Sequence, residues 1–156
     1  MKKFSSKTQK TGEIGENLAC KFLVKHGFSV LERNYTKKWG EIDIIAKKKG
    51  VLRFVEVKAG VTHETLSKVT RVTMAGIPQG KTQSVTHETI GHVTRETFRP
   101  EENLHPQKLK RLFRAIETYL AQNKLQDKPW QVDLAIVSLN LENKEGRVRM
   151  LENIII

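Results

Sequence analysis

Two β-branched stretches joined by a short glycine-containing turn constrain the fold of this chain more than any other feature. Residues Trp39–Lys47 and Val51–Ala59 alternate in polarity, and Lys48-Lys49-Gly50 between them is typical of a β-hairpin. The preceding segment Phe28–Tyr35 is also extended in character. The sequence therefore predicts a three-stranded meander.

The hairpin brings four charged side chains into register. If its turn has two residues, Asp43 lies opposite Glu56 and Glu41 lies opposite Lys58. Because side chains alternate between the two faces of a strand, all four then share one face. Directly opposed Cβ atoms are about 5 Å apart. The two carboxylates would therefore repel each other while losing hydration beside apolar neighbours.

A carboxylate pair of this kind needs a positive charge between its members. A hard divalent cation meets that need, and the Lys58 ammonium would stand next to it. The alternative is structural: Asp43 and Glu56 pair with Lys58 and nearby lysines on a solvent-facing sheet. The strands are otherwise apolar on both faces, as expected for a sheet covered by helices, so the sequence favours the metal site.

Two amphipathic segments supply the helices that would cover the sheet. Apolar residues at helical spacing predict a first helix over about Thr11–His26 and a second along the stripe Leu109–Leu120, with Pro106 in its first turn. Two further strands are predicted at Trp130–Leu139 and Arg147–Ile155. The resulting order is α-β-β-β-α-β-β in one layered α/β domain.

Glu16 adds a third carboxylate on the first helix. It borders the apolar arc, with the small residues Ala19 and Cys20 one turn on, so its side chain can reach inward over the sheet. Gly12 and Gly15 would permit a close backbone approach there. The alternative is a glutamate that only favours the N-terminal end of the helix dipole.

Two segments lack the pattern of either element. Residues 1–10 carry lysines and no acid, which predicts a basic disordered tail. Residues 60–105 are rich in Thr, Gly, His and charge without an apolar period, which predicts a flexible insert within a single domain of residues 11–156. The insert is either functional or a tolerated surface insertion.

The charge balance narrows the class of partner. Twenty-eight Lys and Arg against 17 Asp and Glu give a net charge of +11, which favours nucleic acid as a partner ahead of anionic membrane. The apolar runs are too short to span a bilayer, no signal-peptide apolar region is present, and the single Cys20 cannot form an intramolecular disulfide. We therefore expect a cytoplasmic protein with no membrane partner.

Several short runs of the chain also match a family pattern. They are Thr-Gly-Glu-Ile-Gly-Glu-Asn-Leu-Ala at 11–19, Arg33-Asn34-Tyr35, Gly40-Glu41-Ile42-Asp43-Ile44-Ile45-Ala46, Phe54-Val55-Glu56-Val57-Lys58, Lys108-Leu109-Lys110-Arg111-Leu112, Val132-Asp133-Leu134 and Glu152-Asn153. Together they resemble the uncharacterised YraN family of endonuclease-like proteins. That family is similar to the archaeal Holliday-junction resolvases and belongs with the PD-(D/E)XK restriction-endonuclease-like fold.

The resemblance implies a three-layer domain with a central mixed sheet flanked by helices, and a nuclease that depends on Mg²⁺ or Mn²⁺. In it, Asp43 and Glu56 would bind the metal with help from the Val57 carbonyl. Lys58 would orient or activate the attacking water, and Glu16 would be the helix-borne acidic residue. Resolvase-like relatives act as symmetric dimers, so a homodimer is expected by analogy.

Two functional classes follow. The first is a metal-dependent endonuclease that hydrolyses phosphodiester bonds of DNA, branched or junction DNA in particular; the second is a nucleic-acid-binding protein that keeps the nuclease fold without turnover. The candidate nucleic-acid contacts are Lys108, Arg111, Arg33 and Lys37. Lys108 and Arg111 have the alternative of a solvated helix flank. Asp133 has no assigned role.

Overall fold

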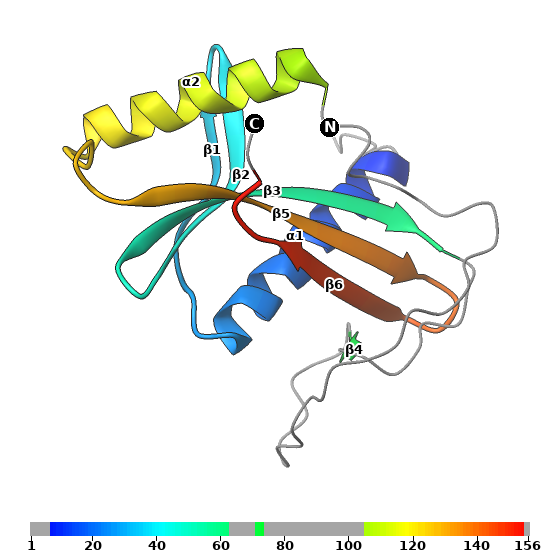
Figure 1. The fold of residues 1–156 in the computed structure, drawn as a ribbon. Coiled ribbons are helices and arrows are strands. Elements are labelled where there is room, and N and C mark those ends of the chain that lie inside the picture. Colours follow the sequence, from blue (N-terminus) through cyan, green and yellow to red (C-terminus); the bar gives the residue numbers. More distant parts are fainter. Residues whose placement is uncertain (1–6, 63–70, 74–104, 155–156) are drawn as a thin grey trace, which may run out of the picture.

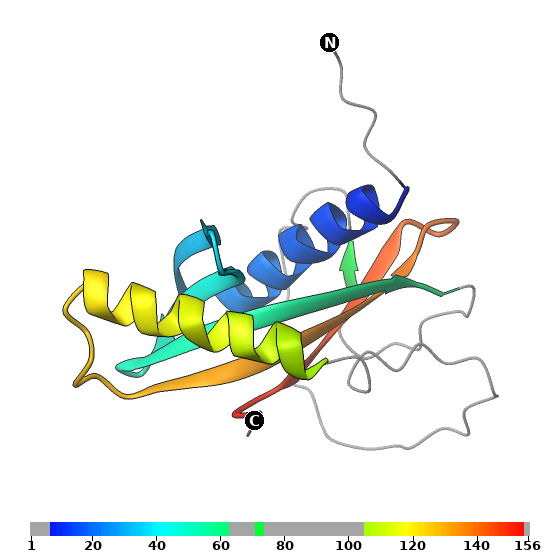
Figure 2. The same ribbon diagram turned by 90° about the horizontal axis from the view of Figure 1, so that it is seen from above.

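A mixed β-sheet lies between two helices in this computed structural model, which describes residues 7–62, 71–73 and 105–154. Helix α1 (Lys7–Lys25) covers one face of the sheet and helix α2 (Pro106–Gln122) covers the other (Figures 1 and 2). The three layers predicted from the sequence are therefore confirmed.

The sheet has six strands in the spatial order β1-β2-β3-β5-β6-β4. Strands β3 and β5 are parallel and all other neighbours are antiparallel, so the sheet is mixed as expected. A parallel pair needs a crossover connection, and α2 lies within it. The strands are β1 (Ser29–Lys37), β2 (Gly40–Lys48), β3 (Val51–Val61), β4 (Arg71–Thr73), β5 (Trp130–Asn140) and β6 (Glu145–Leu151).

The predicted order α-β-β-β-α-β-β is confirmed, with corrections at three places. Helix α1 begins at Lys7 and not near Thr11, because residues 7–10 contain no helix-breaking glycine or proline. Strand β6 ends at Leu151 and not at Ile155, since Asn153 adopts a left-handed φ of 52°. The insert contributes the short strand β4, which pairs with β6.

The predictions of a disordered tail and a flexible insert fall mainly outside the described residues. Residues 1–6, 63–70 and 74–104 are not described. The described ends of this segment belong to the neighbouring elements: β3 continues to Val61, and His105 caps the first turn of α2.

The turn of the β2–β3 hairpin has the predicted geometry. Lys49 and Gly50 both have positive φ, 49° and 84°, as a two-residue type I′ turn requires. Lys48 pairs with Val51 directly beside the turn. This register continues to the pair of Ile44 and Val55, so the register predicted from the sequence is correct along the paired part of the hairpin.

Each helix buries its own apolar cluster against the sheet. The cluster under α1 joins Leu18 and Leu23 to sheet residues such as Val55 and Val137. The cluster under α2 joins Leu112 and Ile116 to sheet residues that include Ile42, Ile45 and Phe54. In the described ranges, neither helix is long and apolar enough to cross a membrane.

Two glycines let the helices approach the sheet closely. A Cβ atom on Gly15 would clash with the Ala59 Cβ on β3, and a Cβ atom on Gly40 would clash with the Arg111 carbonyl on α2. The predicted close approach is therefore present at Gly15. It is absent at Gly12, where a Cβ atom would meet none of the described residues within 4 Å.

Asp133 belongs to a buried structural network. It is fully buried and accepts hydrogen bonds from Arg53 Nε at 2.6 Å and from the Asn153 backbone N–H at 2.8 Å. Arg53 also pairs with Glu152, just beyond β6. Because breaking a buried pair leaves an uncompensated charge, this network fixes the C-terminal segment against β3 and β5.

Substitution of two glycines in α1 tests the helix packing. Gly12→Ala is expected to raise the free energy of unfolding by about 0.5–1 kcal/mol, because alanine favours a helix and the site is open. Gly15→Ala is expected to lower it by about 1–3 kcal/mol through overpacking against Ala59. Urea denaturation measures both, and equal stability of the two variants would contradict this packing.

Candidate metal and nucleic-acid site

Strands β2 and β3 separate at Asp43. Their backbone pairing ends at Ile44 and Val55, and the Val57 N–H donates to Asp43 Oδ2 at 2.7 Å. A side-chain carboxylate thus accepts a hydrogen bond from the neighbouring strand where the backbone ladder has ended. Figure 1 shows β2 leaving their shared turn beside β3 and then bending toward α2.

The strand also rotates at this point. Ile42 packs in the cluster under α2, whereas Ile44, two residues on, packs in the cluster under α1. In a regular strand these two side chains would share one face. The backbone of β1, which pairs with β2, changes conformation at the same level. Asn34 adopts a left-handed φ of 52°, and the residues on either side of it, Arg33 and Tyr35, pair with Ile44 and Ile42. Asn34 therefore permits the rotation that opens the space at Asp43.

Glu56 is the most deeply buried carboxylate of this region. Its side chain is 1% exposed, and Oε1 lies 3.5 Å from the Lys58 Nζ and in contact with the Lys108 Nζ. Its second oxygen, Oε2, has no hydrogen-bond partner in the described part of the chain. A buried oxygen without a partner is costly, so Glu56 is poised to accept a further cation or donor.

The carboxyl group of Asp43 carries the largest electrostatic perturbation of the site. Burial and repulsion from Glu56 raise its pKa to about 7, although the Val57 N–H and the Lys108 ammonium act in the opposite direction. Glu16 on α1 raises this pKa further. Glu16 is therefore close enough to influence the charge of Asp43, although α1, which carries Glu16, lies on the face of the sheet opposite to α2 and Lys108.

The two lysines of the site differ in their electrostatic environment. Burial and the nearby Lys108 ammonium lower the pKa of Lys58, and Glu56 offsets this only in part. Burial also acts against the charge of Lys108, but its contact with Glu56 outweighs burial and raises the pKa of Lys108. Lys108 is therefore held as the cation that neutralises Glu56.

The predicted pairing of Glu41 with Lys58 is wrong. Glu41 is exposed and pairs across the backbone with Thr36 on β1, because β2 has already left β3 at this level. Lys58 instead forms its ion pair with Glu56, two residues before it on the same strand. The four charged side chains therefore do not form the two opposed pairs expected from the register.

The donor atoms present suit a hard divalent cation. Asp43 and Glu56 supply carboxylate oxygens, and Val57, whose carbonyl is the third predicted ligand, lies beside both of them. Within the described ranges, no three His, Cys, Asp or Glu residues form a ready cluster that could hold a metal ion. The carboxylates converge as a pair, with Glu16 farther away.

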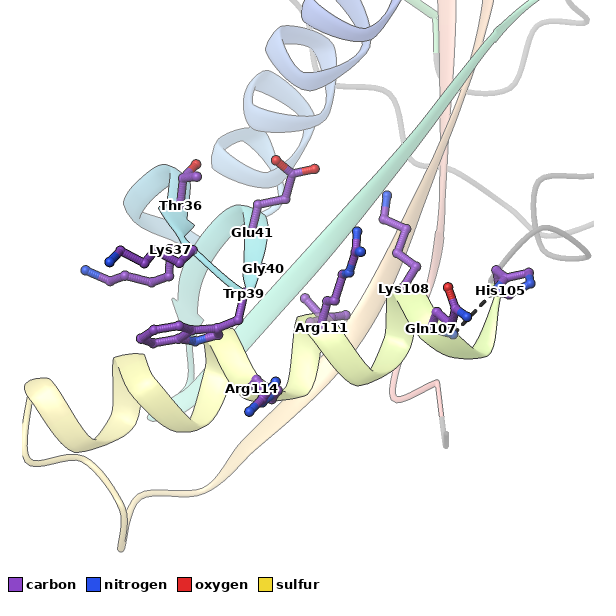
Figure 3. A pocket seen from close by; sticks show the side chains of 12 residues that line it. Thr36, Lys37, Trp39, Gly40, Glu41, His105, Gln107, Lys108, Arg111 and Arg114 are labelled. Atoms are coloured by element: carbon purple, nitrogen blue, oxygen red, sulfur yellow. Dashed lines mark hydrogen bonds between the residues drawn. The ribbon is translucent and has the colours of Figure 1, made fainter.

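A groove runs from this site along α2. It has a volume of about 740 Å³ and lies between α2 and the segment Thr36–Glu41, which joins β1 to β2. Figure 3 shows Lys108 and Arg111 projecting from α2 to the same side as Glu41. Lys108 lines the groove and contacts Glu56, so it connects the groove to the carboxylate pair.

Three of the four predicted nucleic-acid contacts line this groove: Lys108, Arg111 and Lys37. Arg33 does not, because its guanidinium donates to the Asn17 side chain on α1 at 2.8 Å. The groove also contains cationic and aromatic residues that the sequence pattern does not single out. These are Lys38, Trp39 and Arg114. Arg114 could have been predicted, because it lies three residues after Arg111 on the same helix and is therefore its neighbour on the helix surface.

A mixed sheet between two helices, with converging carboxylates where two of its strands separate, defines a three-layer α/β protein of nuclease-like fold. The chain belongs to the uncharacterised protein family UPF0102, whose model matches residues 15–137. This confirms the resemblance to the YraN family. The matched range includes the carboxylates, Lys58 and Lys108.

The similar proteins bear the same family name. A UPF0102 protein of Helicobacter pylori strain HPAG1 is 34% identical over 99% of this chain and 98% of its own length. One from Helicobacter hepaticus is 32% identical over 92% of each chain. A UPF0102 protein of Campylobacter fetus is 57% identical over 61 residues, which cover 38% of this chain and 54% of its own.

The raised pKa of Asp43 predicts a pH-dependent stability. Between about pH 4 and pH 7 the folded state retains a proton that the unfolded state has lost, so the stability contributed by this group falls as pH rises. Asp43→Asn removes this titration. The free energy of unfolding of the variant, relative to that of the wild type, should therefore rise between pH 4 and pH 7 by at most about 4 kcal/mol. Above pH 7 this difference should stay constant.

Urea denaturation in EDTA measures this difference at each pH. Glu41→Gln is the matched control, because it removes an exposed carboxylate from the same strand. A difference between Asp43→Asn and the wild type that stays constant from pH 4 to pH 8 would contradict the assignment.

Proposed function

We propose that this protein is an endonuclease that depends on Mg²⁺ or Mn²⁺ and hydrolyses phosphodiester bonds of DNA, with branched or junction DNA as the preferred form. One observation carries the proposal: within the described residues, buried Glu56 has an oxygen, Oε2, without a hydrogen-bond partner, and the charge of Glu56 opposes the ionisation of Asp43. Two carboxylates in this relation are stabilised by a shared cation. The basic groove beside them suits a polyanionic substrate.

In this proposal Asp43, Glu56 and the Val57 carbonyl hold the cation, and Glu16 adds negative charge from α1. The bound cation would supply charge that offsets the negative charge of the phosphate in the transition state. The half-buried Lys58 has a lowered pKa, which suits a residue that orients water or exchanges a proton with it. Lys108 would exchange its contact with Glu56 for one with the phosphate.

The names of the relatives state a family and no reaction, so the proposal rests on the site itself. The homodimer expected by analogy with resolvases stays a prediction. A dimer would place two such sites on the two strands of a symmetric junction.

One observation favours the second function, nucleic-acid binding without cleavage. Glu56 Oε1 already has the ammonium groups of Lys58 and Lys108 as partners, as in a structural ion-pair network. In that case the groove would bind nucleic acid, and the carboxylates would only stabilise the fold.

Cleavage of supercoiled plasmid and of a labelled four-way junction in Mg²⁺ or Mn²⁺ distinguishes the two functions. The wild type should cleave, and Glu56→Gln and Lys58→Ala should each lose about 10²-fold or more of the rate, because each removes a group that acts on the reacting phosphate. Glu32→Gln should remain active, since Glu32 is an exposed carboxylate on β1 and is not among the residues that line the groove.

Binding measured in EDTA completes the comparison. Both inactive variants should still bind the junction, because Arg111 and Arg114 are unchanged. Cleavage that survives Glu56→Gln would contradict the assignment of the site. Binding without cleavage in either metal would support the second function.

A further inference from the structure

An exposed tryptophan stands in the basic groove beside the candidate metal site. Trp39 is 40% exposed and belongs to neither of the two buried apolar clusters. Its indole N–H donates to Thr118 Oγ1 on α2 at 3.1 Å, and the Thr118 hydroxyl donates in turn to the Arg114 carbonyl at 2.7 Å. The indole N–H therefore has its hydrogen-bond acceptor, and this bond holds the ring in place. The apolar surface of the ring remains available to a ligand.

The surroundings of Trp39 are cationic. Among the described residues, five Lys and Arg side chains and one carboxylate line the groove: Lys37, Lys38, Lys108, Arg111, Arg114 and Glu41. Figure 3 shows Arg114 close to Trp39 on the helix, with Arg111 and Lys108 following toward the N-terminus of α2. Cations interleaved with an exposed aromatic ring are the elements of a single-strand binding surface.

The groove has a direction. Lys108, Arg111, Arg114 and Thr118 follow one another at spacings of three and four residues, so they trace an arc of about 120° around α2 from one end of the groove to the other. From Lys108 to Thr118 the helix rises about 15 Å, which is the length of about four stacked nucleotides at about 3.4 Å each. Lys108 contacts Glu56 at one end, and Thr118 holds Trp39 at the other.

Stacking distinguishes an unpaired strand from a duplex. In a duplex both faces of a base are already stacked on its neighbours, so the ring of Trp39 can stack only on a base that is unpaired or at an end. The cationic side chains alone would attract duplex and single strand alike. Trp39 therefore supplies the contact that selects the form of the nucleic acid.

We propose that this groove binds a short single-stranded segment of DNA, with a base stacked on Trp39 and phosphates held by Arg111 and Arg114. The inference rests on the proposed nuclease function and deepens it. It places unpaired nucleotides a few positions away from the phosphodiester bond that would be cleaved beside Glu56. The preferred substrate is then a fork or flap, whose single-stranded arm follows α2.

Base-dependent binding in EDTA tests this inference apart from cleavage. Fluorescence anisotropy at one ionic strength compares a labelled oligothymidylate with an abasic oligomer of equal length and charge. The wild type should bind the oligothymidylate roughly 5- to 150-fold more tightly, since one stacked base contributes on this scale. Trp39→Ala should bind both with similar affinity and keep the affinity for the abasic oligomer.

Trp130→Phe is the matched control. Trp130 is 37% exposed but packs against Phe54 and Phe113 away from the groove, so this variant should retain the full preference for bases. It also leaves Trp39 as the sole tryptophan. Oligothymidylate should then quench the remaining fluorescence, and the abasic oligomer should not. This readout needs no change at Trp39, so it holds even if Trp39→Ala fails to fold.

Equal affinity of the wild type for the two oligomers, or fluorescence of Trp39 that does not respond to bases, would overturn the inference. If the protein still cleaves DNA in that case, the proposed nuclease function stands and only the proposed binding of a single strand in the groove is refuted. Base-dependent binding without cleavage in Mg²⁺ or Mn²⁺ would support the groove and refute the nuclease.

Discussion

The hydrogen bond from the Val57 N–H to the Asp43 carboxylate is the contact on which the rest of the site depends. It lies just beyond the last backbone pair of β2 and β3, where the two strands separate. Because the strands separate there, side chains from both faces of the sheet can approach one another. Glu16 acts from the α1 side and Lys108 from the α2 side, and both influence the same carboxyl group.

Close helix packing brings these side chains within range. Gly15 lets α1 pack on Ala59 of β3, and Glu16 is the next residue along the helix. Gly40 lets the backbone of α2 pass over the start of β2 at Arg111, one turn from Lys108. The same approach forms one wall of the basic groove. Backbone packing and site chemistry are therefore coupled through the residues next to two glycines.

Local pattern was enough to predict much of this arrangement. The Lys49-Gly50 turn fixes a register that can be worked out by counting, and this register holds as far as Ile44 and Val55. Asp43 lies one position beyond the paired part, and its carboxyl group is still close enough to Glu56 for the two charges to repel each other. Counting failed at Glu41, because it assumes a regular ladder, whereas β2 rotates and leaves β3 beyond Ile44. The left-handed backbone at Asn34 that accompanies this rotation depends on tertiary packing. Trp39 was missed because only the structure shows an indole that is anchored by Thr118 and still exposed.

The central claim is that Asp43 and Glu56 share one divalent cation, and a crystal soaked in Mn²⁺ tests it most directly. An anomalous difference map should show a peak within bonding distance of the Asp43 carboxylate and Glu56 Oε2, with Lys108 withdrawn from Glu56. A map without a peak, in which the ammonium group of Lys108 still rests on Glu56 at saturating Mn²⁺, would contradict the account.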